Sequence, residues 1–448
     1  MKQKFLLLLL LVCLYGTTQG QTDTTAVMRM LLHAEGVQSV EPLHSEPYAE
    51  KYVVRLTQNV DGDTADKGTF SQRLIVGVKG LDRPTVMVTE GYFAQYALRP
   101  DYEEELSRLF DANVIVCEYR YFGESKPLAL LPKGRAPEAA TWDDYWQYMT
   151  VANSLRDLHH VRQSLGSVFT GKWLSTGISK GGQTTMFYRA TYPDDVDVSV
   201  SYVAPLNRAV EDGRHEPFLA RTVGTKAERK AVRRAQQEML RRKARLLPRF
   251  EQYAADHHYR YNAPAADIYD YCVLEFPFAL WQWGTPVSTI PSVKADDDTW
   301  FDYFVETAGP DYFQCPSDFT PFHVQAMHEL GYYGYSTRGL HHMSVTDTRG
   351  YLPRLMLPRQ LQQIPFDDTL YRHTVNYLKE NDPRHIFIYG EIDPWTASGV
   401  ADWLDCSSKQ NMRVYVQPRG SHRTRIGTMP EQQRTEIMSR LTKWLTNE

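Results

Sequence analysis

Gly177-Ile178-Ser179-Lys180-Gly181 is the stretch of this chain that decides its fold. It follows a short strand pattern over Lys172–Thr176 and precedes a helical pattern over Gln183–Tyr192. Glycines two residues to either side of a serine allow a tight turn from strand to helix, because no Cβ atom blocks the close backbone approach. Such a turn raises the serine hydroxyl above the sheet edge and sets it at a helix N-terminus, where negative charge is favoured. We therefore predict that Ser179 is a nucleophile rather than part of an ordinary glycine-rich turn.

Short apolar runs on both sides of this turn predict the remaining strands. They are Thr85–Thr89, Val114–Glu118, Lys172–Thr176, Val196–Val203, His385–Tyr389 and Arg413–Gln417. Helical patterns lie between them, and strands that alternate with helices are typical of a parallel sheet covered on both faces. Two earlier alternating runs, Tyr52–Val60 and Phe70–Lys79, predict an antiparallel hairpin. The sequence thus predicts an α/β-hydrolase fold with an eight-stranded, mostly parallel sheet.

The region 208–380 interrupts this pattern between the sixth and seventh strands. It holds few β-branched runs, and it is rich in aromatic residues, including Trp281, Trp283 and Trp300. We predict that it is an inserted, mainly helical cap. The hydrolase domain then consists of two parts, 21–207 and 381–448.

A strongly basic helical pattern covers Lys226–Arg245 within the cap. Such a run can bind phosphate groups. However, several apolar residues fall near one face of the helix, namely Ala231, Ala235, Met239 and Leu246. An amphipathic helix with a solvated charged face is therefore the interpretation we prefer. The net charge of −4 also provides no field that attracts nucleic acid, so we predict no nucleic-acid partner.

The partners of a catalytic serine are expected on loops after late strands, in the order serine, acid, histidine. Asp393 follows the run His385–Tyr389, and His422 follows Arg413–Gln417. Glu391 is a rival carboxylate, but Asp393 precedes a proline and so sits on a sharply defined turn. We predict a triad in which His422 takes the proton of Ser179 and Asp393 orients the imidazole.

Two backbone N–H groups are expected to bind the oxyanion that forms during attack. One is the N–H of Lys180, directly after the nucleophile. The other is the N–H of Gly91 or Tyr92, in the loop after the strand Thr85–Thr89. Glu90 in the same loop is a candidate for binding a substrate ammonium group, although pairing with Arg120 is an equal alternative.

The N-terminus has the pattern of a signal peptide over residues 1–20. Lys2 and Lys4 precede the apolar run Phe5–Leu14, and small and polar residues follow up to Gly20. We therefore expect a secreted or periplasmic protein. No later segment has 18 consecutive apolar residues, so we expect no stable membrane insertion.

Four cysteines follow the predicted signal peptide: Cys117, Cys272, Cys315 and Cys406. Cys117 lies inside an apolar run, where a buried free thiol is expected. An exported protein can form disulfides, and a Cys272–Cys315 pair is left open. No cysteine or histidine pair has the spacing of a zinc site, and no phosphate-binding or dinucleotide motif appears, so we expect no metal and no cofactor.

The stretch Cys117–Ser125, CEYRYFGES, resembles the EHRYYGES motif of lysosomal Pro-X carboxypeptidase and dipeptidyl-peptidase II. The loop Gly390–Trp395 resembles the acid loop of the same peptidases. Lys180, where those peptidases have tyrosine, is similar to a sister family, the secreted bacterial prolyl tri/tetrapeptidyl aminopeptidases found in Streptomyces. This resemblance implies release of short peptides, often tripeptides, from a free N-terminus and frequently after proline. It also implies a cap that rejects internal peptide bonds.

One position departs from the related peptidases. Thr89 stands where the dipeptidyl-peptidase relatives have asparagine before their Glu-Gly pair. Binding of the substrate amine therefore falls to Glu90 or to a cap acid such as Glu275 or Asp318.

We predict an exported serine exopeptidase that acts on peptide substrates through an acyl-enzyme. A carboxylic-ester hydrolase of the same fold and a non-catalytic binding protein are the alternatives. The sequence predicts neither the length of the released peptide nor the oligomeric state.

Overall fold

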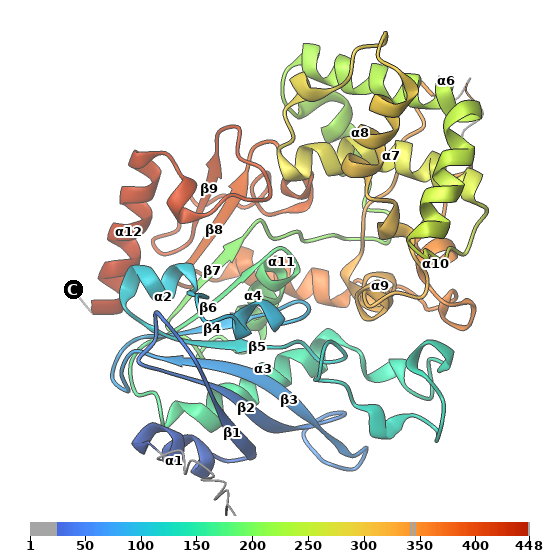
Figure 1. The fold of residues 1–448 in the computed structure, drawn as a ribbon. Coiled ribbons are helices and arrows are strands. Elements are labelled where there is room, and N and C mark those ends of the chain that lie inside the picture. Colours follow the sequence, from blue (N-terminus) through green and yellow to red (C-terminus); the bar gives the residue numbers. More distant parts are fainter. Residues whose placement is uncertain (1–24, 341–342, 344–345, 447–448) are drawn as a thin grey trace, which may run out of the picture.

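The computed structural model describes residues 25–340, 343 and 346–446. The predicted signal peptide, residues 1–20, lies outside this part. Nine strands form one sheet in the order β1-β2-β3-β5-β4-β6-β7-β8-β9 (Figure 1). The strands are β1 Val37–Leu43, β2 Glu50–Asn59, β3 Thr69–Val78, β4 Thr85–Thr89, β5 Asn113–Cys117, β6 Trp173–Ile178, β7 Val198–Tyr202, β8 His385–Gly390 and β9 Arg413–Gln417.

The sheet is mostly parallel. Strands β4 to β9 are mutually parallel, whereas β1, β2 and β3 pair antiparallel with their neighbours. With helices on both faces, this is the arrangement of an α/β hydrolase, and the predicted fold class is confirmed.

The predicted count of eight strands was wrong, because β1 is a ninth. Its sequence, VQSVEPL, is polar, and Val40 is its one buried residue. It pairs only with β2, at the edge of the sheet, where the strand can accommodate Pro42. An edge strand with one buried side chain shows no clear alternation of apolar and polar residues.

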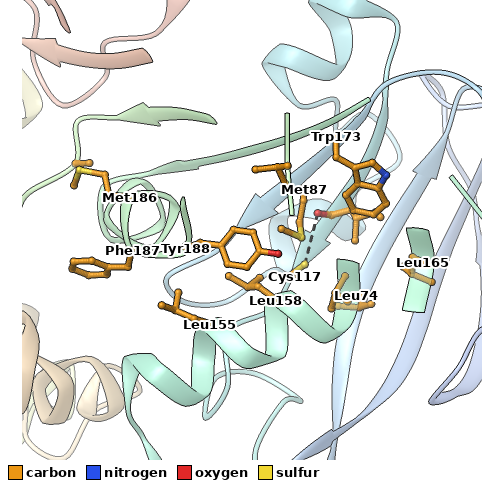
Figure 2. Close-up of a cluster of buried hydrophobic side chains, with 14 of the residues drawn as sticks. Leu74, Met87, Cys117, Leu155, Leu158, Leu165, Trp173, Met186, Phe187 and Tyr188 are labelled. Atoms are coloured by element: carbon orange, nitrogen blue, oxygen red, sulfur yellow. Dashed lines mark hydrogen bonds between the residues drawn. The ribbon is translucent and has the colours of Figure 1, made fainter. Parts of the chain in front are cut away.

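Helices cover both faces of the sheet (Figure 1). α3 Val151–Gly166, α4 Lys180–Thr191 and α11 Thr369–Glu380 pack on one face, together with the N-terminal α1 Ala26–His33. The other face packs against α2 Glu105–Phe110 and α12 Glu431–Thr446. Figure 2 shows the first of these layers, in which Leu155 and Leu158 of α3 and Tyr188 of α4 face Met87 and Cys117 of the sheet.

A mainly helical cap is inserted between β7 and β8 and stands to one side of the sheet (Figure 1). Its helices are α5 His215–Pro217, α6 Lys226–Asp256, α7 Ala265–Trp283, α8 Asp297–Ala308, α9 Thr320–Gln325 and α10 Tyr351–Met356. The cap has a hydrophobic core of its own, formed mainly by α6, α7 and α8. α11 lies inside the predicted cap range, 208–380, but its Leu378 belongs to the cluster beneath the sheet.

The basic helix α6 is amphipathic, as predicted. Its buried face includes Ala235, Met239 and Leu246. On the polar side, Arg242 and Arg245 both form ion pairs with Asp297 of α8, at 2.5 and 2.7 Å. Part of the positive charge of α6 is therefore neutralised within the cap.

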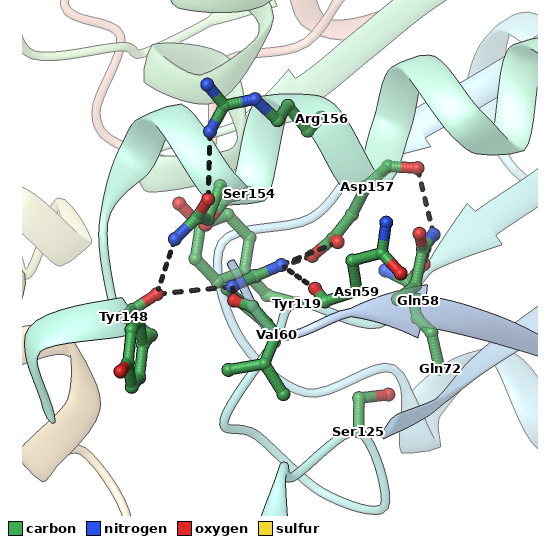
Figure 3. Close-up of polar contacts among 12 residues, drawn as sticks. Gln58, Asn59, Val60, Gln72, Tyr119, Ser125, Tyr148, Ser154, Arg156 and Asp157 are labelled. Atoms are coloured by element: carbon green, nitrogen blue, oxygen red, sulfur yellow. Dashed lines mark hydrogen bonds and ion pairs between the residues drawn. The ribbon is translucent and has the colours of Figure 1, made fainter. Parts of the chain in front are cut away.

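The stretch Cys117–Ser125 contains Arg120, whose buried side chain links several segments of the hydrolase domain. Arg120 is buried and donates to both carboxylate oxygens of Asp157 at 2.7 Å. It also donates to the carbonyls of Val60 and Tyr148, at 2.8 and 3.2 Å (Figure 3). Removing one partner of such a buried pair leaves an uncompensated charge, which costs about 3–5 kcal/mol. The motif Cys117–Ser125 thus contributes a buried ion pair that stabilises the fold.

Four cysteines lie in the described part of the chain, and all of them are free thiols. Three of them are buried: Cys117, Cys272 and Cys315. The Cys272–Cys315 pair that the sequence left open does not form. Among the described residues, no helix is both long and apolar enough to cross a membrane.

Candidate active site

Ser179 occupies the turn that joins β6 directly to α4. Its backbone has φ 58° and ψ −122°, a conformation that is strained for any residue other than glycine. A Cβ atom on Gly177 would lie 2.3 Å from the backbone of Gly181, and one on Gly182 would lie 2.7 Å from the carbonyl oxygen of Tyr202. The two glycines are therefore required by close backbone contact. This turn has the geometry of a nucleophile elbow, in which a serine is raised above the sheet.

Asp393 and His422 meet at the ends of the neighbouring strands β8 and β9. Asp393 is fully buried, and its Oδ2 lies 2.6 Å from Nδ1 of His422. The N–H of Trp395 donates to Oδ1 of Asp393 at 3.1 Å and holds the carboxylate in place. Glu391, the rival acid, is exposed and instead accepts a hydrogen bond from the N–H of Arg419. Of the two acids, only Asp393 is placed to orient the imidazole.

The bond to Asp393 leaves Nε2 of His422 as the nitrogen that can accept a proton. Within the described part of the chain, no hydrogen bond joins His422 to Ser179. Catalytic hydrogen bonds are often long in ligand-free enzymes and shorten when the substrate binds. The backbone N–H of His422 donates to the carbonyl of Gln282 in α7 at 2.9 Å, so the cap supports the loop that carries the histidine.

Lys180 contributes a buried side chain as well as its backbone N–H. The side chain is 2% exposed, and Nζ donates to the carbonyl of Gly91 at 2.7 Å. Nζ also lies 3.4 Å from the ring centroid of Tyr119 and 5.4 Å from that of Tyr92. Desolvation lowers the pKa of Lys180 well below its usual value. The lysine therefore ties the loop after β4 to the nucleophile elbow.

Gly91 packs tightly against the elbow. A Cβ atom at this position would lie 2.7 Å from the Lys180 side chain and 3.0 Å from the backbone nitrogen of Gly181. The two predicted sources of oxyanion donors, Lys180 and the Gly91–Tyr92 segment, are thus brought together. The Gly91 N–H donates to Oε2 of Glu90 at 3.1 Å, and the backbone N–H of Tyr92 also interacts with that carboxylate, so both N–H groups remain candidates for the second donor.

Glu90 is placed away from the substrate space. Its carboxylate accepts a hydrogen bond from the hydroxyl of Tyr96 in addition to the bond from Gly91. Burial raises the pKa of Glu90. It does not pair with Arg120, which binds Asp157. Because Glu90 does not line the cavity beside Ser179, the structure does not bring it to a substrate amine.

A cavity of about 1020 Å³ opens in front of Ser179. Lys180 and Tyr92 line it from the hydrolase domain, Trp283 and Tyr333 line it from the cap, and Trp395 lines it from the acid loop. Cap and hydrolase domain thus enclose the space together. Among the described residues, no group of three or more His, Cys, Asp or Glu is arranged to hold a metal ion.

Several residues of this site were not predicted from the sequence. The Trp283 and His422 rings are arranged edge to face with their centroids 6.0 Å apart, and the ring centroids of Trp395 and Tyr333 lie 5.4 Å apart. The Lys180 side chain was also missed, since only its backbone N–H was considered. The richness of the cap in aromatic residues was the available signal, but spacing along the chain does not separate Trp283 from Trp281, which is buried in the cap core.

Comparison with known families adds a second line of evidence. The profile of the family described as PS-10 peptidase S37 matches residues 23–447. The chain belongs to this family. It is therefore a serine peptidase, and peptides are its substrates.

Individual proteins also resemble this S37 peptidase. Prolyl tri/tetrapeptidyl aminopeptidase of Streptomyces mobaraensis is 29% identical over 424 residues, which cover 92% of this chain and 84% of that protein. Among solved structures, VinJ has a TM-score of 0.41 at 13% identity, covering 88% of this chain and 98% of its own. Proline iminopeptidase of Mycobacterium smegmatis has a TM-score of 0.36 at 16% identity, covering 88% and 99%.

Proposed function

We propose that this S37 peptidase is an exopeptidase that releases short peptides from free N-termini, with Ser179, His422 and Asp393 as its catalytic triad. The observation that carries the proposal is the place of Ser179. It stands on a strained elbow, at the wall of a cavity that the cap encloses. Asp393 holds His422 against Trp283, a residue of the cavity wall, and Nε2 of the imidazole has no hydrogen-bond partner among the described residues.

The mechanism follows from this geometry. Ser179 Oγ attacks the carbonyl carbon of the scissile bond while Nε2 of His422 takes the hydroxyl proton. The oxyanion of the tetrahedral intermediate accepts hydrogen bonds from the N–H of Lys180 and from the N–H of Gly91 or Tyr92. The C–N bond then breaks, and His422 returns the proton to the leaving amine. Water repeats the attack on the acyl-enzyme and releases the peptide acid and the free Ser179.

The preference for N-termini and for proline rests on two kinds of support. A cavity enclosed by a cap suits the end of a chain better than its middle. The relative from Streptomyces mobaraensis is named a prolyl tri/tetrapeptidyl aminopeptidase. We infer that this chain likewise releases short peptides, with a preference for proline before the cut.

Mass spectrometry of a mixed peptide library tests this function. Incubation with the wild-type protein is expected to shorten peptides from the N-terminus by a few residues, while Ser179→Ala releases nothing. N-acetylated copies of the same peptides are expected to stay intact. Equal cleavage of free and acetylated peptides contradicts the exopeptidase proposal, and turnover of acyl esters alone supports a carboxylic-ester hydrolase.

A fluorophosphonate probe tests the chemistry separately from substrate choice. The probe is expected to label Ser179 in the folded wild-type protein and to leave Ser179→Ala unlabelled. Absence of labelling in folded wild-type protein favours the non-catalytic binding protein instead.

We also propose export from the cytoplasm, on the basis of the signal pattern over residues 1–20. Expression of the full chain in a bacterium is expected to yield a mature protein in the periplasm or the medium. N-terminal sequencing of that protein is expected to begin at Gln21. An intact N-terminus in the cytoplasmic fraction contradicts the proposal.

A further inference from the structure

The cavity in front of Ser179 carries an excess of negative charge. Lys180 and Arg260 are its cationic side chains among the residues that the structure describes. Five acids line it: Glu138, Glu275, Glu306, Asp311 and Asp318. Four of the five are exposed to solvent, whereas Glu275 is 5% exposed. Solvent screens the exposed carboxylates, so Glu275 is the acid that would interact most strongly with a cation inside the cavity.

Only one oxygen of Glu275 has hydrogen-bond partners. The hydroxyls of Tyr333 and Tyr335 both donate to Oε2, at 2.8 and 2.7 Å. Oε1 has no partner among the described residues, and no Lys, Arg or His of that part of the chain forms an ion pair with Glu275. Burial raises the pKa of Glu275 to about 8, so the carboxyl is mostly protonated at neutral pH unless a cation beside it favours the carboxylate. A buried carboxylate of this kind lacks the cation that normally compensates it.

Neighbouring tyrosines hold the carboxylate in one orientation. Tyr333 stacks on Phe278 at 4.0 Å, and its hydroxyl lies 2.9 Å from that of Tyr312. Tyr312 is in turn hydrogen-bonded to Tyr332. This chain of hydroxyls fixes Oε2, and Oε1 of this cavity-lining residue keeps no hydrogen-bond partner among the described residues.

We propose that Glu275 binds the N-terminal ammonium group of the peptide substrate. This inference rests on the proposed exopeptidase function and names the residue that would select free N-termini. The ammonium supplies the positive charge that Glu275 lacks, and it donates a charge-assisted hydrogen bond to Oε1. Tyr333 and Tyr335 are positioning residues for the carboxylate.

Helix α7 places Glu275 at a suitable distance from the triad. Glu275, Ala279, Gln282 and Trp283 line the cavity from one face of this helix. At its far end, Gln282 accepts the N–H of His422 and Trp283 contacts the His422 ring. Glu275 lies two helical turns earlier, roughly 10 Å along the axis at about 1.5 Å per residue. An extended peptide covers that distance with about three residues at roughly 3.3–3.6 Å each.

Glu275→Gln tests the proposal, with Glu306→Gln as the matched control. The control makes the same substitution in the same cavity, but at an exposed carboxylate. The substrates are a fluorogenic tripeptidyl amide with a free amine, its N-acetylated twin, and p-nitrophenyl acetate. Glu275→Gln is expected to raise the KM of the free-amine substrate by about 10- to 100-fold. Turnover of p-nitrophenyl acetate is expected to stay within about threefold, and Glu306→Gln is expected to change neither value by more than that.

The outcomes separate the two proposals. If the wild-type protein cleaves the free and acetylated peptides equally, the exopeptidase function itself fails. If the wild type prefers the free amine and Glu275→Gln keeps that preference, only the role of Glu275 fails. An equal loss towards all three substrates in Glu275→Gln also overturns the role, because it shows a merely structural residue.

A binding measurement covers the case in which Glu275→Gln folds poorly. Calorimetry with Ser179→Ala and the free tripeptide Ala-Ala-Pro is expected to show binding, and the N-acetylated tripeptide is expected to bind at least tenfold more weakly. Tyr335→Phe keeps the charge of Glu275 and removes one of its two donors, so it is expected to weaken binding of the free tripeptide only. Equal affinity for both tripeptides in Ser179→Ala overturns the proposal.

Discussion

At the scale of single residues, Asp393 and Glu391 stand two positions apart but have different surroundings. Asp393 is buried against His422, while Glu391 is exposed. We expect Asp393→Asn to lower kcat by roughly four orders of magnitude, because the amide favours the wrong imidazole tautomer. Glu391→Gln is the control and is expected to keep kcat within about threefold. Steady-state kinetics with one peptide substrate measures both, and a larger loss in Glu391→Gln contradicts the assignment.

Lys180 gives a second prediction at this scale. Lys180→Met keeps the length of the side chain but removes the donor to the Gly91 carbonyl. The loop that carries the Tyr92 N–H then loses its tie to the elbow, so kcat is expected to fall about 10- to 100-fold. The melting temperature is not expected to fall, because the substitution also removes a buried amine whose desolvation is costly. Lys226→Met, at an exposed lysine, is the control. An unchanged kcat with a lower melting temperature shows that Lys180 serves stability alone.

Sequence reasoning at the residue scale placed Asp393 beside His422, as the structure does, because a local rule applies. Asp393 precedes a proline and follows a strand, and both signals can be read along the chain. Glu90 failed to reach the cavity because its side-chain direction depends on Tyr96, which no local rule predicts. The role of the Lys180 side chain likewise depends on Gly91 and Tyr119, which come from other strands.

At the scale of elements, the buried strands and the amphipathic helices were predictable, and the edge strand was not. β5 could be recognised because all five of its residues are buried and all of them after Asn113 are apolar. β1 has one buried residue and could not be recognised. α11 could not be assigned to the sheet layer from sequence, because its apolar face does not show which surface covers it.

A buried histidine in α5, His215, gives a prediction about how stability depends on pH. His215 in α5 is fully buried beside Trp395, and its Nε2 lies 3.1 Å from Oγ of Ser398. Burial lowers the pKa of His215 to about 4. The unfolded chain takes up a proton near pH 6.5, and the folded protein takes it up only near pH 4. The stability that neutral His215 contributes is therefore complete above pH 6.5 and is lost as the pH falls towards 4.

His215→Gln removes this titration. The free energy of unfolding of the variant is expected to depend less on pH between 6.5 and 4, by about 1.4 kcal/mol per pH unit. Urea unfolding at pH 7.5, 6.0 and 5.0 measures the difference. His33→Gln, at an exposed histidine, is the control and is expected to follow the wild type. Parallel pH profiles for wild type and His215→Gln contradict the prediction.

At the scale of the whole molecule, the cap and the hydrolase domain are joined close to the triad. Gln282 of α7 accepts the N–H of His422, and Glu228 of α6 forms an ion pair with Arg419 at 2.7 Å. The cap side of the cavity is therefore fixed to the loop that carries His422, the general base that we propose. The existence of a helical insert was predictable from composition. Its attachment to the His422 loop was not, because it depends on contacts between distant parts of the chain.

This enclosure predicts discrimination by chain topology. A linear peptide with a cleavable N-terminal segment is expected to be processed, whereas the head-to-tail cyclic form of the same sequence is expected to remain intact. The cyclic form has no end to place in the cavity. Mass spectrometry over a time course compares the two, and the linear N-acetylated form serves as the control. Cleavage of the cyclic peptide at the linear rate contradicts a cavity that accepts only chain ends.

The unpaired state of Cys117, Cys272, Cys315 and Cys406 bears on how the protein can be handled. Because no disulfide joins these positions, the conformational entropy of the unfolded chain is not reduced by cross-links. The native state therefore needs no oxidant to form. A reductant such as dithiothreitol should leave the urea midpoint unmoved. The folded domain is thus expected to form under reducing conditions, and oxidative refolding is an unnecessary step in its preparation.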